Sequence, residues 1–567
     1  MTSLDARVGG VATARRGLDE GRVASVLVAL LVGVLVVTIA LPLWSLLSKS
    51  MQDASGAFVG LANFITYFTT PSLVSALWNS LWVALLTTAI VVPLAFVYAY
   101  ALTRSAMPFK GLFTALALLP IFAPSLLAAI SLIYLFGNQG IMKGLLFGHS
   151  IYGPIGIVFS EVTYCFPHAM MIIVTALRLS DGRLYEVADA LGTTPQRVFF
   201  TITLPGARYG LISAAFVVFT LVITDFGIPK VIGGQFNVLA TDAYKQIVGQ
   251  QNFEMGAVVG LILLMPAVLA FFVDRHIQKR QVALLSARAV PYEPKVAPLR
   301  DGLLMGYCIV IGLVLAGMLA MAVWASFITY WPYNMTPTLK NYVFANFDPG
   351  GWGPYFTSLW MSALVAVIGT ALIFSGAYLI EKTRVSPLLR GAAHFLAMLP
   401  MAVPGLVLGL GYVFFINAKW NPLNVLYATL ALLVINTVAH FYTVAHITAT
   451  TALKQIDNEF EAVSASLKVP FWTTFRRVIV PISLPAILDI AVYMFVNAMT
   501  TISAVVFLYG PSTKLASIAI VHMDEAGATA AAAAMATCIA LTAITVKLAH
   551  VLLDRLVFNR LQAWRRR

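Results

Sequence analysis

Charged residues are scarce in this sequence: they make up 10% of its 567 residues, whereas 60% are hydrophobic and the mean hydropathy is +0.88. So few polar side chains cannot cover a water-soluble globule of this size, which predicts a protein that lies in a bilayer. Apolar runs of roughly 20 residues recur along the chain, and each is long enough to cross a hydrocarbon core of about 30 Å.

Cysteine is also scarce, and the three that occur are Cys165, Cys308 and Cys538. All three fall inside predicted spans at unrelated spacings, which argues against a disulfide framework or a thiolate metal site and favours small core residues. The histidines lack metal-ligand spacing as well, because His440 and His446 lie six residues apart and do not share a helix face. No metal site is expected.

The phosphate-binding loop of nucleotide hydrolases, GxxxxGK followed by Ser or Thr, does not occur in the sequence. Paired carboxylates and a nucleophile elbow are not evident either. We therefore expect neither an enzyme nor a cofactor bound by this chain.

Twelve apolar runs predict an all-α integral membrane protein. The N-terminal arm carries Arg7, Arg15, Arg16 and Arg22, and the run that follows is too long for a signal-peptide core, so we expect a retained first helix. The predicted spans are 23–47, 81–102, 112–136, 155–177, 211–228 and 255–273, followed by 303–327, 359–380, 392–416, 423–447, 487–508 and 527–553.

Basic residues are distributed unevenly between the loops on the two sides of the predicted spans. With a cytoplasmic N-terminus, only seven of the 36 Lys and Arg residues fall outside the cytoplasm. This asymmetry predicts that both termini are cytoplasmic, and it accounts for the formal charge of +13 without a nucleic-acid-binding module. The seven are Lys49, Lys143, Lys230, Lys245, Lys340, Lys419 and Lys514.

The chain reads as two six-helix copies. "LPIFAPSLLAAISLIYLFG" from Leu119 matches the rhythm of "LPMAVPGLVLGLGYVFFIN" from Leu399, and "SLW" opens a span at both Ser80 and Ser358. Because six is even, both copies enter the membrane in the same sense, which implies a pseudo-two-fold axis along the membrane normal with a pathway between the halves. We expect a first repeat at 1–273, a cytoplasmic linker at 274–301 and a second repeat at 302–567.

A polar island follows the fourth span of each half. The first spans 181–206 and contains "EVADALGTTPQRVFFTITLP"; the second spans 457–485 and contains "AVSASLKVPFWTTFRRVIVP", 276 positions further on. In the first island we expect a helix that ends at Gly192, an N-cap at Thr194, and a second helix that begins at Pro195 and ends at Pro205. A single such segment would suit an interfacial amphipathic helix. Two equivalent copies favour docking sites for a partner that also comes in two copies.

The first island resembles the EAA motif of ABC importer permeases, in which Glu-Ala-Ala is followed by Gly and then by Ile-x-Leu-Pro. The resemblance implies that the islands are coupling helices for two cytoplasmic ATPase subunits, which would bind the ATP and Mg. The second copy departs from the motif, so we expect a differently shaped coupling surface there. The implied coupling residues are Glu186, Ala188, Gly192, Pro195, Phe199, Ile202, Leu204 and Pro205, and then Glu461, Ala462, Lys468, Phe475, Val478 and Pro481.

Two complete permease halves in one chain resemble the ferric-iron, thiamine and phosphonate branch of type I ABC importers. Stretches such as "YAYALTRSAMPFKG" from Tyr98 and "SIYGPIGIV" from Ser150 resemble permeases assigned to 2-aminoethylphosphonate. The resemblance implies a bacterial inner-membrane importer that receives this solute from a periplasmic binding protein, with ferric iron or thiamine as the alternative cargo. A proton-coupled carrier of six plus six helices is a more distant alternative, because it needs no docking islands.

Ionisable residues inside spans are costly and mark candidate positions along the pathway. Glu161 and Asp225 are the sharper candidates, because a carboxylate could receive the ammonium group of an aminophosphonate. The alternative is that they pair internally or lie near a membrane interface. His168, His440, His446 and Asp489 are further such residues. Four prolines in the third and ninth spans predict either a flexible gate or simple kinks: Pro120, Pro124, Pro400 and Pro404.

Overall fold

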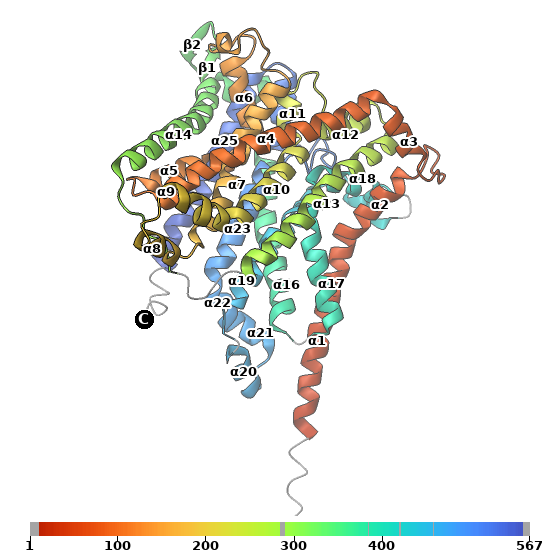
Figure 1. Ribbon diagram of the computed structural model, residues 1–567. Coiled ribbons are helices and arrows are strands. Elements are labelled where there is room, and N and C mark those ends of the chain that lie inside the picture. The colour runs from red at the N-terminus through yellow and green to blue at the C-terminus, as the bar shows by residue number, and fades with distance from the viewer. Residues whose placement is uncertain (1–10, 284–289, 384, 419–420, 458, 559–567) are drawn as a thin grey trace, which may run out of the picture.

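A computed structural model of the chain describes residues 11–283, 290–383, 385–418, 421–457 and 459–558. Arg7 and Lys419, which entered the charge argument, lie outside these residues. Within them, nine helical stretches are long and apolar enough to cross a membrane, and three sharply bent pairs raise that number to as many as 12. The predicted all-α membrane fold is therefore confirmed (Figure 1).

Both halves are built almost entirely from helices. The first half contains α1 (Val11–Leu35), α2 (Leu41–Ser50), α3 (Ala62–Thr69), α4 (Pro71–Arg104), α5 (Lys110–Leu118), α6 (Ser125–Phe136), α7 (Pro154–Arg178), α8 (Arg183–Ala190), α9 (Pro195–Val198), α10 (Leu204–Thr224), α11 (Gly227–Ile232), α12 (Leu239–Tyr244) and α13 (Phe253–Ala283). The second half contains α14 (Pro298–Ser326), α15 (Gly353–Leu364), α16 (Thr370–Lys382), α17 (Pro387–Met398), α18 (Gly405–Ile416), α19 (Leu430–Lys454), α20 (Glu459–Ser466), α21 (Phe471–Thr474), α22 (Val480–Ile482), α23 (Leu484–Thr500), α24 (Ala516–Glu525) and α25 (Thr529–Leu553). A short antiparallel hairpin of β1 (Ile328–Tyr330) and β2 (Asn334–Pro337) follows α14.

The third and ninth spans are broken rather than kinked. The helices on either side of Pro124 meet at 99°, and those on either side of Pro404 meet at 114°. Ala123, which precedes Pro124, is extended at φ −104° and ψ 144°, as expected for a residue whose α conformation clashes with the following proline ring. The predicted spans 112–136 and 392–416 therefore each consist of two helices joined at a sharp bend, next to prolines for which we expected either a gate or a kink.

The fifth and eleventh spans end earlier than predicted. Helix α10 ends at Thr224 and α23 at Thr500, and each is followed by connecting segments that lead to a short helix, α12 or α24. Ser80 accepts a hydrogen bond from the first amide of α12, Leu239 (2.7 Å), and Ser358 does the same for the first amide of α24, Ala516 (2.8 Å). The repeated "SLW" of the sequence therefore holds the start of one short helix in each half.

The first span of each half packs against helices of the other half. Helices α1 and α2 pack against α16, α17 and α18, while α14 packs against α4, α5 and α6. Tyr412 of α18 donates to the carbonyl of Thr38 in the first span (2.7 Å), and Tyr307 of α14 donates to the carbonyl of Leu94 in α4 (2.8 Å). The two repeats are thus intertwined.

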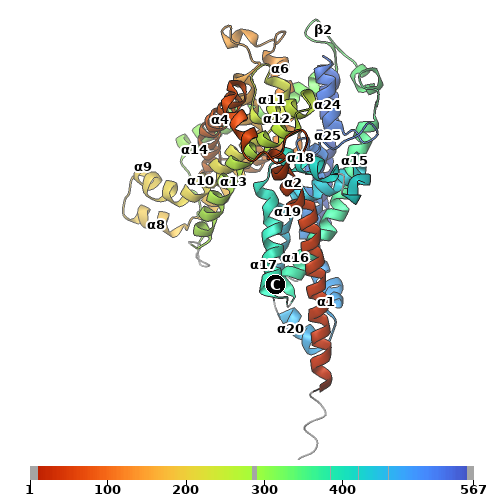
Figure 2. The same cartoon turned by 90° about the vertical axis from the view of Figure 1, so that its right-hand side faces the viewer.

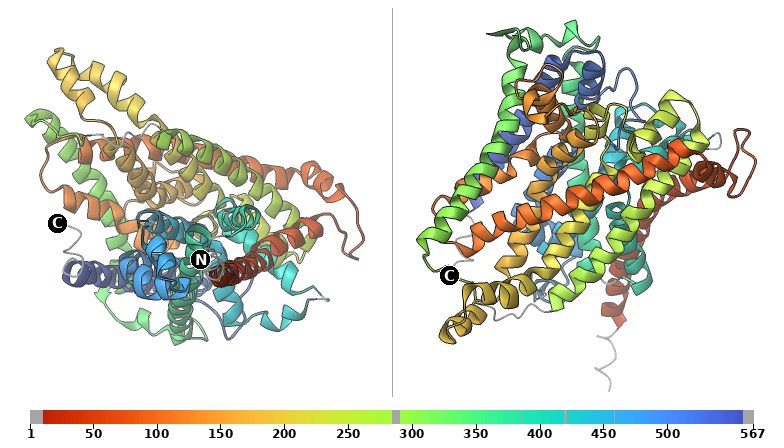
Figure 3. Two further views of the ribbon diagram at one scale, coloured as in Figure 1. Left: turned by 90° about the horizontal axis from the view of Figure 1, so that it is seen from below. Right: turned by 45° about the horizontal axis from the view of Figure 1, so that its top comes forward.

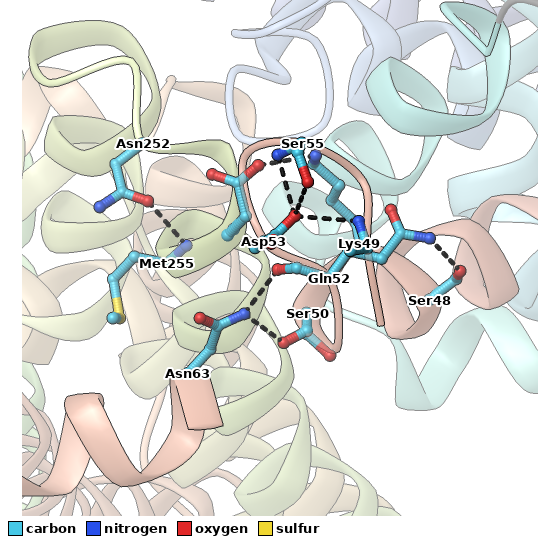
Figure 4. Close-up of polar contacts among 11 residues, drawn as sticks. Ser48, Lys49, Ser50, Gln52, Asp53, Ser55, Asn63, Asn252 and Met255 are labelled. Atoms are coloured by element: carbon cyan, nitrogen blue, oxygen red, sulfur yellow. Dashed lines mark hydrogen bonds and ion pairs between the residues drawn. The ribbon is translucent and has the colours of Figure 1, made fainter. Parts of the chain in front are cut away.

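An asparagine side chain closes the loop after the first helix of each half. Asn63 donates to the carbonyls of Ser50 (2.9 Å) and Gln52 (2.8 Å), as Figure 4 shows. Asn341 donates in the same way to the carbonyls of Ser326 (3.0 Å) and Ile328 (2.8 Å). In the first half, Lys49 beside this loop also forms an ion pair of 2.7 Å with Glu254 at the start of α13.

Helices extend into the predicted linker 274–301 from both sides. Helix α13 continues beyond the expected end of its span to Ala283, and α14 begins at Pro298. Residues 284–289 lie outside the described residues. The described, non-helical part of the linker is 290–297.

Candidate functional site

The two polar islands lie at the same end of the molecule. Figure 2 shows α8 and α9 at the lower end of one half and α20 at the lower end of the other, whereas β2, α6 and α24 lie at the opposite end. The view from below in Figure 3 shows the first island projecting away from the rest of the bundle. A partner with two equivalent subunits could therefore approach both islands from one side.

The first island folds as a helix, a turn and a second helix, as predicted. Gly192 adopts φ +63°, in the left-handed region of backbone conformation. The amide of Thr193 donates to the carbonyl of Ala188 (2.9 Å), and this hydrogen bond closes the C-terminal end of the right-handed helix α8. Thr194 is extended, and its hydroxyl accepts a bond from the amide of Arg197 (3.5 Å), so it is the N-cap of α9. Pro195 is the first residue of that helix.

The second island keeps this turn although it lacks the glycine. Lys468 adopts φ +54°, and the amide of Val469 donates to the carbonyl of Ser464 (2.9 Å), which repeats the bond in the first island. The backbone of the turn is therefore similar in the two islands. Lys468 thus has a left-handed backbone conformation, which costs a residue with a Cβ about 1–2 kcal/mol.

Pro205 does not end the second helix of the first island, contrary to prediction. A π-helical turn, Phe199–Thr203, joins α9 to α10, and a continuous helical stretch runs from Pro195 to Thr224. The wider π turn lets the helix continue through a residue that has no amide hydrogen. In the second half the equivalent π turn, Phe475–Ile479, leads into a bend of 77° before α23.

An aromatic contact joins each island to the second predicted span of its own half. The ring of Phe199 lies 6.0 Å from that of Phe96 and 5.9 Å from that of Tyr100, both in α4. The ring of Phe475 lies 6.0 Å from Phe374 and 4.7 Å from Tyr378, both in α16. Phe199 and Phe475 therefore fix the islands to the helical bundle.

The first short helix of each island exposes an apolar stripe that the sequence reasoning missed. Its members are 41% to 76% exposed and recur at spacings of three and four residues, on one helix face. Each member in the first half has an apolar counterpart 276 positions later, which is the signal that could have revealed it. The stripe consists of Leu184, Val187 and Leu191 in the first half and of Phe460, Val463 and Leu467 in the second.

The residues of the EAA-like motif differ in how far they are exposed to solvent. Ala188 lies on the buried face of α8, whereas Glu186 and Pro195 are exposed. Ile202 and Leu204 are half-buried in the helix that follows, and Pro205 is exposed. In the second island Ala462, Lys468 and Pro481 are exposed, and Glu461 and Val478 are half-buried.

Several candidate pathway residues of the first half come together where the third span breaks. Glu161 is fully buried, with one carboxylate oxygen unpartnered, and lies near enough to Asp225 for their charges to interact. Asp225 accepts a bond from the amide of Ile228 at the start of α11 (2.8 Å). A Cβ on the neighbouring Gly227 would lie 2.9 Å from Ser125, the residue after Pro124. The break at Pro124 therefore places the start of α6 beside the carboxylates.

The second half carries no carboxylate at these two positions. Thr437 and Thr501 stand 276 positions after Glu161 and Asp225, and both are buried. The repeat can therefore fold without the acidic pair. Among the described residues, no three His, Cys, Asp or Glu side chains gather into a cluster that could hold a metal ion.

The other ionisable and proline candidates are scattered. His440 lies beside Gly405, next to the second break, and His446 is buried within 5.8 Å, ring to ring, of Tyr442 and of His394. His168 contacts the carbonyl of Tyr164, one turn earlier in its own helix. Asp489 is 57% exposed and pairs with His550 at 3.5 Å. Pro120 and Pro400 are buried in the 3-10 turns that precede the two breaks.

Comparison with known proteins gives several relatives that are named as transport permeases. The ferric transport system permease FbpB of Actinobacillus pleuropneumoniae is 28% identical over 429 residues, 72% of this chain and 61% of its own length. FbpB 1 of Haemophilus influenzae, a candidate ferric permease by name, is 28% identical over 70% of this chain and 64% of its own length. The chain thus spans less than two thirds of these two relatives. PhnU of Salmonella typhi, named as a candidate 2-aminoethylphosphonate permease, is 25% identical over 39% of this chain and 80% of its own length.

The family described as "binding-protein-dependent transport system inner membrane component" matches the sequence twice, at residues 91–282 and 373–559. Each match contains one polar island, one broken span and one of the two short helices α12 and α24. The chain therefore belongs to this family of ABC transporter permeases and contains its permease domain twice, fused in one polypeptide.

Proposed function

We propose that the chain forms the transmembrane pathway of an ATP-driven importer, and that each polar island docks one cytoplasmic ATPase subunit. The apolar stripes on α8 and α20 carry this proposal. Exposed apolar side chains at matching positions of two repeats are costly in water but suit insertion into a cleft on a partner. The proposal places both termini in the cytoplasm of a bacterium, with a periplasmic binding protein on the opposite side and repeats at 1–273 and 302–567.

The docking proposal is tested by placing a charge in each stripe. Val187→Asp and Val463→Asp should each weaken binding of the ATPase and lower ATP-driven uptake into proteoliposomes by at least tenfold, because a carboxylate would be buried without a partner. Leu145→Asp is the control, since Leu145 is also exposed (60%) but lies between the third and fourth spans. Full uptake and normal ATPase binding in both stripe variants would refute the proposal.

For the cargo we propose 2-aminoethylphosphonate. The relative PhnU supports this choice, and so does the acidic pair Glu161 and Asp225, which could receive an ammonium group at a buried site. Asp225→Asn should lower uptake of 2-aminoethylphosphonate more than uptake of a phosphonate that lacks the amine. Asp489→Asn, at a carboxylate that is exposed and already paired with His550, should leave both unchanged.

Ferric iron is the second candidate cargo, because the two FbpB relatives align over a larger share of the chain than PhnU does. The ligand of the partnering binding protein separates the two. Calorimetry of that protein with 2-aminoethylphosphonate and with chelated ferric iron should show binding of the former. Tight ferric binding without phosphonate binding would overturn the choice.

A further inference from the structure

The linker between the halves lies across the start of the first island's helix α8. The amide of Gly182 donates to the carbonyl of Val290 (2.8 Å), and the amide of Val290 donates to the carboxylate of Asp181 (3.3 Å). A Cβ on Gly182 would come within 3.0 Å of the carbonyl oxygen of Pro291. The linker and the island are therefore in close backbone contact.

An arginine side chain contacts one aromatic ring of the linker and one of the island, and the two rings also contact each other. The guanidinium of Arg104, at the end of α4, lies 4.8 Å from the ring centre of Tyr292 in the linker and 5.1 Å from that of Tyr185 in α8. The two rings are 4.4 Å apart. Arg104 is 3% exposed and also donates to the carbonyl of Leu177 (2.6 Å). Desolvation at such a buried site strengthens each cation–π contact.

The same segment of the linker leads directly into the second half. Lys295 pairs with Asp189 of α8 at 2.8 Å, a contact that is largely exposed and therefore weak. Arg300 donates to the carbonyl of Lys295 (2.6 Å) and pairs with Asp301 in the first turn of α14 (2.9 Å). A continuous set of contacts thus runs from α8 through the linker to α14.

The second island has a different anchor at the equivalent place. Lys382, at the end of α16, pairs with Glu461 of α20 at 3.3 Å and donates to the carbonyl of Ile456 (2.9 Å). Glu461 stands 276 positions after Tyr185, and Lys382 ends its helix as Arg104 ends α4. An ion pair within the second half therefore replaces the aromatic contact with the linker.

We propose that residues 290–297 act as a strap that positions the first docking helix, with Tyr292 and Arg104 as positioning residues. The strap ties α8 to α14 of the other half, so a displacement of α8 by its ATPase subunit is passed to both halves. The second docking helix lacks this link within the described residues. This inference rests on the proposed function for its mechanical consequence, but not for the contact itself.

The test compares Tyr292→Ala with Tyr292→Phe, which keeps the ring, in the full-length protein in nanodiscs. Hydrogen exchange at residues 183–190 should become about tenfold faster in the alanine variant, as loss of roughly 1.4 kcal/mol implies, and stay at the wild-type rate in the phenylalanine variant. Exchange at 459–466 should not change in either. Unchanged exchange at 183–190, or an equal rise in both helices, would overturn the strap.

A second readout uses the complete transporter with its ATPase and binding protein. Tyr292→Ala should raise the number of ATP molecules hydrolysed per solute taken up by at least twofold, with the ATPase still bound, and Tyr292→Phe should not. An unchanged ratio would show that the contact does not position the helix for coupling. Failure of the ATPase to bind the stripe of α8 would instead refute the proposed function, while the exchange result would stand.

Discussion

At the scale of single residues, the two turns after α8 and α20 have the same backbone but different side chains. Gly192 and Lys468 both have positive φ, and no atom lies within 4 Å of the position where a Cβ on Gly192 would sit. A side chain at Gly192 would therefore have room, and only the backbone conformation would be strained. Lys468 carries this strain in the native protein.

Substitutions at the two turns should consequently act in opposite directions. Gly192→Ala should destabilise the C-terminal end of α8 by about 1 kcal/mol, and Lys468→Gly should stabilise that of α20 by a similar amount. Hydrogen exchange at residues 187–193 and 463–469 measures both. A slower exchange in Gly192→Ala, or a faster one in Lys468→Gly, would contradict the explanation.

His522, on the face opposite the islands, should make stability depend on pH. Burial and the nearby Lys514 lower the pKa of His522, while Glu525 and Asp348 act in the opposite sense. Its ring nitrogen lies 3.3 Å from the hydroxyl of Tyr509. Lys230 also faces this group and lowers its pKa further.

Because the pKa of His522 is lower in the folded protein than its ordinary value of about 6.5, protonation favours the unfolded state. Its contribution is complete above pH 6.5 and is lost as the pH falls below that value. The melting temperature of the wild type should fall more between pH 7.5 and 5.5 than that of His522→Asn. Parallel curves for the two proteins would exclude this role.

At the scale of elements, Ser80 and Ser358 stabilise the starts of the short helices α12 and α24 by accepting a hydrogen bond from the first amide of each. Ser80→Ala and Ser358→Ala should each leave a buried amide without its acceptor, at a cost of about 1–3 kcal/mol. Ser75→Ala is the matched control, because Ser75 is exposed and bonds only within its own helix. Thermal unfolding in nanodiscs should separate the first two variants from the third. Equal melting temperatures for all three variants would show that the hydrogen bonds of Ser80 and Ser358 do not stabilise the protein.

The elements also show which features sequence reasoning can reach. Hydrophobic runs located the spans because burial in lipid demands them, and Gly192 and Thr194 located the turn because its chemistry is local. The breaks at Pro124 and Pro404 were read as gates or kinks, since a proline alone does not say whether neighbouring helices restore the lost hydrogen bonds. The apolar stripe on α8 was missed because exposed apolar residues do not stand out in an apolar chain.

At the scale of the whole molecule, close packing joins the two halves. A Cβ on Gly411 of α18 would lie 2.7 Å from the carbonyl oxygen of Pro42 in the first span, which is too close for a carbon atom that cannot form a hydrogen bond. Gly411→Ala should therefore push the first span away from the second half and destabilise the protein by about 1–3 kcal/mol. Gly391→Ala is the control, because nothing lies within 4 Å of its Cβ position. A melting temperature unchanged by Gly411→Ala would argue against the intertwined arrangement.

The exchange of first helices between halves could not be derived from sequence. Both α1 and α14 are apolar over most of their length, and hydropathy does not reveal which neighbour such a helix contacts. The sequence repeat predicted two similar halves, and it could not distinguish side-by-side halves from intertwined ones. The linker contacts were equally out of reach, because they depend on where α14 begins in space.

The central claim is that both islands contact ATPase subunits, and site-directed cross-linking tests it most directly. Leu191→Cys and Leu467→Cys, in the apolar stripes, and Leu145→Cys, on the loop between the third and fourth spans, would be treated with a short thiol cross-linker in the assembled transporter. We predict that the ATPase subunit is captured from both stripe positions and not from position 145. Capture from neither stripe position, or equal capture from all three, would contradict the claim.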